Sequence, residues 1–198
     1  MIEALVISNV VSWLAVLGLG VMLYALSRQI GVLHERIKPV GALAIGKALK
    51  IGEASPFFRE TSLTGGMASV GGESVDGRAT LLFFMSSSCP VCKLLLPVLK
   101  KIGKQESSWL RLVFSSDGHE VEHREVIAEH GLHDYPYLLS TEIGVAYQIS
   151  KLPYGVLIAP NGQIAAHGLI NNREHIESLF EAYAASARGG DHVDRLAG

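Results

Sequence analysis

Residues 80–93 read TLLFFMSSSCPVCK, an apolar run that leads into Cys89 and Cys92, the two cysteines of the chain. The apolar residues predict a strand over Thr80–Met85 that is buried on both faces. Leucines and lysines follow and predict a helix over Lys93–Lys104. The cysteines therefore lie where a strand passes into a helix, and the N–H groups and dipole of a helix N-terminus stabilise a thiolate. Cysteines in such places have pKa values lowered from ~8.5 to roughly 3.5–7.5.

This spacing favours a pair that opens and closes a disulfide, but three other roles are open to it. A purely structural disulfide would close a very short loop and would stabilise the fold little. Half of a zinc site would need two further ligands, and the sequence has no second Cys-x-x-Cys. The third alternative is two inert thiols in the core.

Length and charge narrow the class of protein. The 198 residues are enough for one domain with additions, and the net charge of −2 with a pI near 6.4 offers no basic surface for nucleic acid. The mean hydropathy of +0.30 is high, and the N-terminal residues explain much of it.

Residues 4–26 contain no charged side chain. As a helix they would be ~35 Å long, enough for a bilayer core of ~30 Å. An acidic Glu3, the length of the run and the lack of a small-residue cleavage motif favour an uncleaved anchor over a signal peptide. We therefore expect residues 1–27 to form a single transmembrane helix with the lipid bilayer as its partner. A buried core helix is the alternative.

Two arguments about membrane orientation disagree. Arg28, Arg36 and Lys38 follow the apolar run, and a basic flank normally stays in the cytoplasm. Disulfide chemistry favours the oxidising side of the membrane.

The rest of the chain is divided by its glycines, prolines and charges. We expect a juxtamembrane linker over 28–50, helical at first, a compact domain over 51–187 and a disordered tail over 188–198. Besides the segment around the cysteines, the patterns predict strands at 67–70, 110–114, 156–159 and 163–167, and helices at 119–131, 142–149 and 173–187, the last capped by Asn172. This order predicts an α/β fold with a mixed central sheet flanked by helices.

The same order resembles the thioredoxin family. Pro97 follows the cysteine pair at the place where that family's active-site helix carries a proline, and Gly162 and Gly168 match glycines of its membrane-linked branch. Leu152-Pro153 precedes a predicted hairpin strand where the family has a cis-proline. The resemblance implies a thioredoxin-like fold and a cis peptide bond at Pro153.

A closer resemblance covers the whole chain. Residues 83–93, 151–154 and 167–171, together with the anchor, are similar to the methylamine utilisation proteins of the MauD family. That resemblance implies a protein of the bacterial inner membrane with its catalytic domain in the periplasm. The client implied is the disulfide-rich small (beta) subunit of methylamine dehydrogenase, and a membrane redox partner is implied as well. No cofactor is implied.

The chain departs from ordinary thioredoxins in two ways. Ser88 replaces the aromatic residue before the first cysteine, and no acidic residue occurs within 80–88, where thioredoxins keep a buried carboxylate. Both departures fit an oxidant or isomerase better than a general reductase.

The helix start assigns a role to each cysteine. Cys89, at the helix N-terminus, is the expected nucleophile, and Cys92, one turn further into the helix, is the expected resolving residue. Pro90 and Val91 would tune the redox balance between them. Lys93 would add positive potential, or is simply a solvated lysine.

The resemblance adds a substrate site. With Pro153 cis, the backbone of Leu152 would pair with an extended client chain. Two other functions remain open: a chaperone that binds the same client without redox chemistry, and a thioredoxin-like reductase for cytochrome maturation.

Residues 119–123 spell His-Glu-Val-Glu-His, the H-E-x-x-H pattern of zinc hydrolases. On one helix, His119 and His123 would share a face, with Glu120 as the base. Adventitious metal binding and a solvated charged face are the alternatives. The surrounding charges favour the solvated face, and we expect no metal site.

Overall fold

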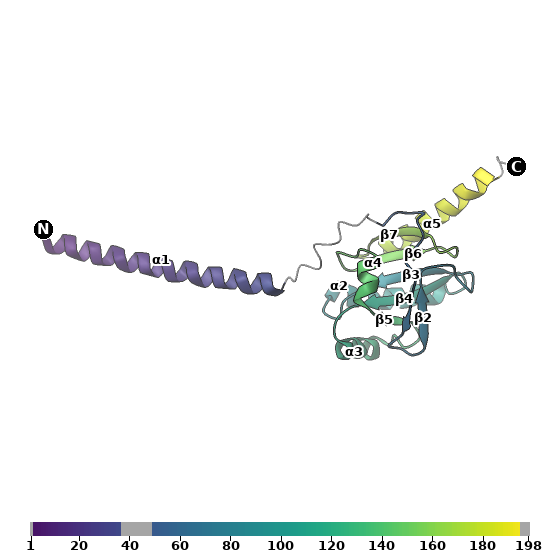
Figure 1. Ribbon diagram of the computed structural model, residues 1–198, viewed down its shortest axis with the longest axis horizontal. Helices are drawn as coiled ribbons and strands as arrows, with labels where there is room; N and C mark the ends of the chain where they lie inside the picture. Colours follow the sequence, from purple (N-terminus) through teal and green to yellow (C-terminus); the bar gives the residue numbers. More distant parts are fainter. Residues whose placement is uncertain (1, 37–48, 195–198) are drawn as a thin grey trace. The chain divides into compact units, whose positions relative to one another are not determined.

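The computed structural model describes residues 2–36 and 49–194. The chain divides into two units, Met1–Ile45 and Gly46–Gly198, and each is described by itself (Figure 1).

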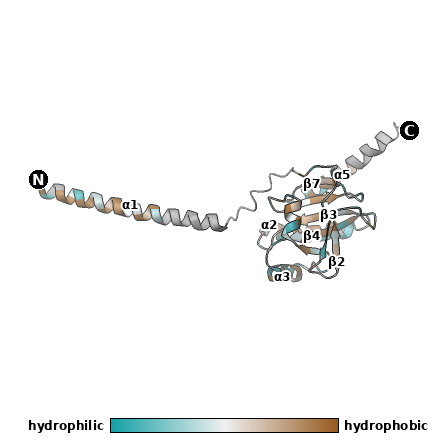
Figure 2. Cartoon of the chain, viewed as in Figure 1, coloured by the Kyte–Doolittle hydropathy of each residue, from teal (hydrophilic) through white to brown (hydrophobic). Residues whose placement is uncertain are grey.

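The first unit is the helix α1 (Ile2–Arg36). Its stretch Val6–Tyr24 has a mean hydropathy of 2.1 and no buried residue, and the ribbon of Figure 2 is coloured as hydrophobic over many of its residues. By length and composition this stretch is a candidate membrane span, and within the described residues it is the one helix that qualifies. The helix continues to Arg36, so the first part of the expected linker is helical; residues 37–48 lie outside the described residues.

The second unit is built on a five-stranded sheet in the order β5-β4-β3-β6-β7. Strands β3, β4 and β5 are parallel, whereas β6 and β7 run antiparallel to their neighbours. Their bounds are Ala79–Phe84 for β3, Leu110–Ser116 for β4, Tyr137–Leu139 for β5, Tyr154–Ile158 for β6 and Ile164–Leu169 for β7. The mixed central sheet predicted from the sequence is confirmed.

Helices cover both faces of this sheet. Every residue of β3 is buried. Leu81 and Phe83 face a core shared with α2 (Pro90–Gln105), α3 (Glu120–His130) and α5 (Arg173–Asp194). Leu82 and Phe84 face a second core that includes α4 (Thr141–Ala146) and β2 (Met67–Val70). Alternate side chains of one strand thus enter two cores, which is why β3 has no polar face.

Two strands were not predicted. β1 (Phe58–Thr61) pairs with β2 in a small antiparallel sheet, and its sequence FRET has a partly exposed pattern that carries little strand signal. β5 has only three residues and joins the edge of the main sheet beside β4. Whether such a short segment forms a strand depends on pairing with a neighbouring strand more than on its own sequence.

The last helix begins as predicted but ends later. The Asn172 side-chain oxygen accepts a hydrogen bond from the N–H of His175 (3.0 Å), which is the expected cap. α5 then continues to Asp194, into the segment expected to be a disordered tail from residue 188. Gly189 and Gly190 weaken a helix without blocking it as proline does, so an established helix can extend through them.

Candidate active site

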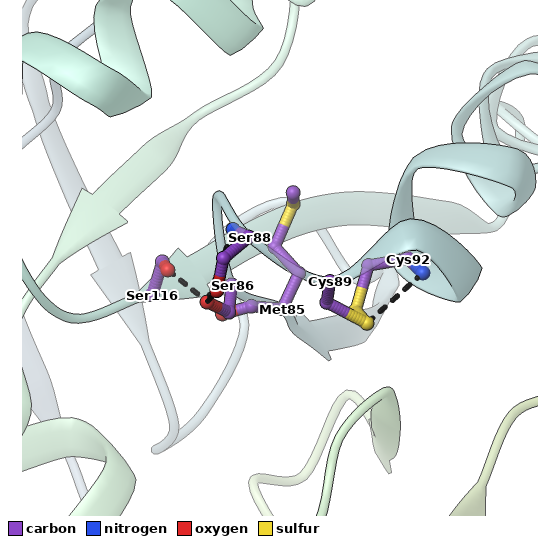
Figure 3. Close-up of a disulfide and its surroundings, with 6 residues drawn as sticks. All are labelled: Met85, Ser86, Ser88, Cys89, Cys92 and Ser116. Atoms are coloured by element: carbon purple, nitrogen blue, oxygen red, sulfur yellow. Dashed lines mark hydrogen bonds between the residues drawn. A yellow bond between two sulfur atoms is a disulfide. The ribbon is translucent and has the colours of Figure 1, made fainter. Parts of the chain in front are cut away.

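The predicted redox pair lies at the first turn of α2. Cys89 is the N-cap residue, with an extended backbone (φ −87°, ψ 108°), and Pro90 follows as the first helical residue. Cys89 and Cys92 form a disulfide with their Cα atoms 5.3 Å apart (Figure 3). The pair therefore lies at the junction between strand β3 and helix α2.

The two sulfur atoms differ in exposure. Cys92 is fully buried, whereas Cys89 is only partly buried and packs at the edge of the core. The Cys92 N–H donates a hydrogen bond to Cys89 Sγ (3.2 Å), and the first turn of α2 contains no acidic residue. A thiolate on Cys89 would keep this N–H donor and the helix dipole as stabilising partners. A visiting polypeptide can reach Cys89 and not Cys92.

The three residues expected to tune the pair surround it. Pro90 and Val91 are exposed between the cysteines. Lys93 is partly buried, and its N–H donates to the Cys89 carbonyl (3.2 Å). Pro90 and Val91 thus occupy the surface that an approaching client would meet first.

The predicted client-binding loop lies at the same end of the sheet. The Leu152–Pro153 peptide bond is cis, as the family resemblance implies. Tyr154, which follows, is the register partner of Phe84, the last residue of β3. The chain leaves β3 toward Cys89 at the sheet end where Pro153 enters β6. Leu152 is 40% exposed and Pro153 is buried.

A short serine segment joins β3 to the cysteines, and sequence reasoning singled out only Ser88 within it. The Cys89 N–H donates to the Ser86 carbonyl (3.2 Å), and the hydroxyls of Ser86 and Ser88 lie 3.1 Å apart. From β4, the Ser116 hydroxyl donates to the Met85 carbonyl (2.7 Å; Figure 3). These bonds hold the approach to Cys89 in one conformation.

The H-E-x-x-H pattern does not form a zinc site. His119 is the N-cap of α3, outside the helix, so the two histidines do not share a helical face. His123 is fully buried: its Nδ1 lies 2.7 Å from the Tyr137 hydroxyl and its Nε2 lies 2.9 Å from the Asp117 carbonyl. The expectation of a solvated face is therefore wrong for His123. Among the described residues, no group of three potential ligands is placed to hold a metal ion.

The segment 80–88, where the resemblance to thioredoxins implies a buried carboxylate, contains no acidic residue. Phe83 is fully buried in the same core as Cys92, and the buried polar or charged residues of the described chain are serines, Thr80 and His123. No buried carboxylate is thus available in this part of the chain to move protons to Cys92. The arrangement can carry out thiol–disulfide exchange through Cys89, with Cys92 as the internal partner.

Comparisons with known proteins agree with this geometry. A family model described as thioredoxin-like matches residues 77–164. The chain is 44% identical to the methylamine utilization protein MauD of Methylorubrum extorquens, over 91% of this chain and 87% of that protein. It is 44% identical to MauD of Paracoccus denitrificans (92% and 90%) and 45% identical to MauD of Methylobacillus flagellatus (89% and 85%).

Solved structures show the same fold at low sequence identity. A structure from Chlorobium tepidum, assigned as a thiol:disulfide interchange protein DsbE, aligns with a TM-score of 0.61 at 18% identity, over 70% of this chain and 98% of that one. The thioredoxin domain of a thiol-disulfide oxidoreductase from Bacteroides vulgatus aligns with a TM-score of 0.55 at 21% identity, over 66% and 98%.

Proposed function

Because the chain belongs to the MauD family of methylamine utilization proteins, we propose that it is a thiol–disulfide oxidoreductase acting on a protein client in methylamine utilization. The observation that carries the proposal is the unequal pair: Cys89 is accessible at a helix N-cap, and Cys92 is buried behind it.

The disulfide form of the pair can oxidise a client. A client thiolate attacks Cys89 Sγ, the Cys89–Cys92 bond breaks, and Cys92 leaves as a thiolate. A second client thiolate then attacks the client sulfur of the mixed disulfide and releases Cys89. The client gains one disulfide, and the pair gains two electrons and becomes a dithiol once its thiolates bind protons. A membrane redox partner would remove these electrons.

The reduced form can rearrange wrong disulfides. Cys89 as a thiolate attacks a client disulfide and forms a mixed disulfide, and the released client thiolate attacks another client disulfide. The client thiolate freed by that exchange attacks the client sulfur bound to Cys89 and releases Cys89 as a thiolate, so neither client nor pair gains or loses electrons. The absence of a buried carboxylate near the pair, within the described residues, favours these reactions over fast reduction of many substrates.

We propose that the client is the small (beta) subunit of methylamine dehydrogenase. The family resemblance implies that proteins of this kind assist the maturation of that disulfide-rich subunit. We propose that Leu152 offers its backbone to an extended client segment beside Cys89, since Pro153 lies at the same end of the sheet. Pro90, Val91 and Lys93 would set the redox balance of the pair.

We propose that α1 anchors the protein in the inner membrane as a single span, with residues 51–187 in the periplasm. Support comes from the apolar stretch Val6–Tyr24 and from a chemistry that needs an oxidising compartment. The basic Arg28 and Arg36 after the span oppose this orientation. Labelling of reduced Cys89 by a membrane-impermeant maleimide in spheroplasts would test it.

Two single substitutions test the function in cells that make methylamine dehydrogenase. Cys92→Ser should trap a mixed disulfide between Cys89 and the small subunit, visible as a reducible band on non-reducing gels. Cys89→Ser should give no such band, and both variants should lower the yield of active dehydrogenase. A Cys89→Ser/Cys92→Ser double variant that still supports full dehydrogenase maturation would favour a client-binding chaperone and refute the redox proposal.

A further inference from the structure

The serine segment before Cys89 is held from outside by helix α3. The Ser87 hydroxyl donates a hydrogen bond to Glu122 Oε2 (2.7 Å), across a sequence separation of 35 residues. Glu122 lies in the first turn of α3, where an acidic residue also complements the helix dipole. This bond ties an acidic side chain to a segment only two residues from the nucleophilic cysteine.

The neighbouring residue fixes α3 in place. In the neutral imidazole, His123 donates from Nε2 to the Asp117 carbonyl, because a carbonyl only accepts, and Nδ1 then accepts from the Tyr137 hydroxyl. Its Nε2 also lies 3.5 Å from Ser116 Oγ, whose proton is donated to the Met85 carbonyl (Figure 3). His123, the residue after Glu122, thus holds α3 to the end of β4 and to β5.

The carboxylate of Glu122 brings negative charge close to Cys89. The Cα atoms of Ser87 and Cys89 are at most about 7 Å apart in extended chain, and the carboxylate lies a further hydrogen bond (2.7 Å) beyond the Ser87 hydroxyl. The charge is therefore on the order of 10 Å from the pair, close to one Debye length at physiological salt (~8 Å). A carboxylate at that distance disfavours a second negative charge on sulfur. It opposes the helix dipole and the nearby Lys93, which both favour the thiolate.

We infer that Glu122 is a positioning residue for the redox pair: it holds the segment before Cys89 through Ser87 and sets the charge balance at the Cys89 sulfur. The inference rests on the proposed function. Strand β3 contains no acidic residue, and Glu122 of α3 provides a carboxylate near the redox site instead. By disfavouring the thiolate, Glu122 makes the dithiol less stable relative to the disulfide. It therefore makes the pair a weaker oxidant than the helix N-terminus alone would.

The test is the pH profile of Cys89 alkylation in the reduced full-length chain, purified in detergent. Cys92 is buried, so iodoacetamide reports on Cys89. Glu122→Gln keeps an acceptor for Ser87 and removes the charge, and we expect the Cys89 thiol pKa to fall by about 0.5 unit. That shift corresponds to an about threefold larger thiolate fraction below the pKa. The equilibrium with glutathione should move toward the dithiol.

Two further variants separate the charge from its placement. Ser87→Ala keeps the carboxylate but releases it from the segment, so its Cys89 pKa should fall between the parent and Glu122→Gln. Glu125→Gln, which removes an exposed carboxylate from the same helix, should leave the Cys89 pKa unchanged. Equal pKa values in the parent and Glu122→Gln, or an equal shift in Glu125→Gln, would overturn the inference. A parental pKa in Ser87→Ala would show that Ser87 does not hold the charge in place.

This test needs no client, so its result is separate from that of the proposed function. A Glu122→Gln shift in a protein that never traps a client refutes the function alone. Normal trapping without any shift refutes the role of Glu122 alone.

Discussion

Cys89 and His123 show how a single residue acquires its chemistry from its environment. Cys89 has an extended backbone before a helix and is partly buried, and a helical N–H donates to its sulfur. His123 belongs to a motif that suggests metal binding, yet both of its ring nitrogens have partners inside the protein. A side chain with satisfied donors and acceptors has no lone pair left for a metal.

His123 should contribute strongly to stability. We expect His123→Ala to lower the free energy of unfolding by about 2–4 kcal/mol, because it leaves the Tyr137 hydroxyl without its partner and opens a cavity. Urea unfolding of the full chain in detergent, followed by near-UV circular dichroism, measures this change. His119→Ala is the matched control: the His119 side chain is exposed and makes no capping bond, so its effect should stay within about 0.5 kcal/mol. Equal losses in both variants would contradict the structure.

At the scale of elements, α3 and the β6–β7 hairpin position the site from either side. α3 supplies Glu122 to the segment before the cysteines, and its His123 is bonded to the Tyr137 hydroxyl of β5. The hairpin supplies the cis-proline loop at the same sheet end and pairs β6 directly with β3. The candidate active site is therefore formed at one end of the sheet by three connections: β3 to α2, β4 to α3, and the loop that enters β6.

The β6–β7 hairpin should be sensitive to substitution of Gly162 in its turn and not of Gly168 in β7. Gly162 has a left-handed backbone (φ +80°), and a Cβ there would lie 2.5 Å from the Gly72 carbonyl carbon. Gly162→Ala should cost about 2 kcal/mol or more, because alanine disfavours this conformation and the turn cannot separate from the β2–β3 connection without loss of contacts.

Gly168 provides the control for that substitution. A Cβ at Gly168 meets nothing within 4 Å, so Gly168→Ala should change the free energy of unfolding by no more than about 0.5 kcal/mol. The same urea titration measures both variants. Similar stability of the two would mean that Gly162 does not approach Gly72 in solution.

At the scale of the whole molecule, two buried tyrosines make stability depend on alkaline pH. Burial raises the pKa of Tyr137 to about 12, and burial also raises the pKa of Tyr147, whose hydroxyl donates to the Pro56 carbonyl (2.8 Å). A raised pKa means that the folded state prefers the neutral phenol. This contribution is complete below the ordinary value of 10.0 and is lost as pH rises toward the folded value.

We expect the free energy of unfolding to fall above pH ~10, by up to about 1.4 kcal/mol per pH unit for each of these tyrosines. Tyr147→Phe should be about 1 kcal/mol less stable at pH 7, where it lacks one hydrogen bond, and should show a shallower decline at high pH. Urea midpoints between pH 7 and 11.5 measure both effects. Parallel curves for parent and variant would refute the assignment to Tyr147.

The anchor should decide where the chain is found in the cell. We expect the parent to remain in the membrane pellet after an alkaline carbonate wash. Leu14→Arg/Leu17→Arg places two charges within Val6–Tyr24, at about 2.5–3.5 kcal/mol each in the middle of a span, and should move the protein to the soluble or aggregated fraction. Leu14→Ala/Leu17→Ala should stay in the pellet. A parent chain released by carbonate would argue against a transmembrane anchor.

Most of the architecture could be predicted from the sequence because its signals are local. The apolar run of β3, the junction at Cys89 and the apolarity of α1 each lie within a short window, where periodicity and propensity are informative. Their positions agreed with the structure to within a few residues. Strands β1 and β5 were not predicted, because a short strand has little sequence signal of its own.

The sequence alone determined that two cysteines share a helix N-terminus, that the strand before them is apolar on both faces and that the chain begins with a helix able to span a bilayer. Tertiary structure decided which of two histidines is buried, which of two glycines is constrained and which carboxylate is hydrogen-bonded to the segment before the nucleophile. Those outcomes depend on partners between 6 and 90 residues away, such as the Asp117 carbonyl for His123, Gly72 for Gly162 and Ser87 for Glu122. Only the packing of α3 and the hairpin on the sheet brings such partners within contact distance.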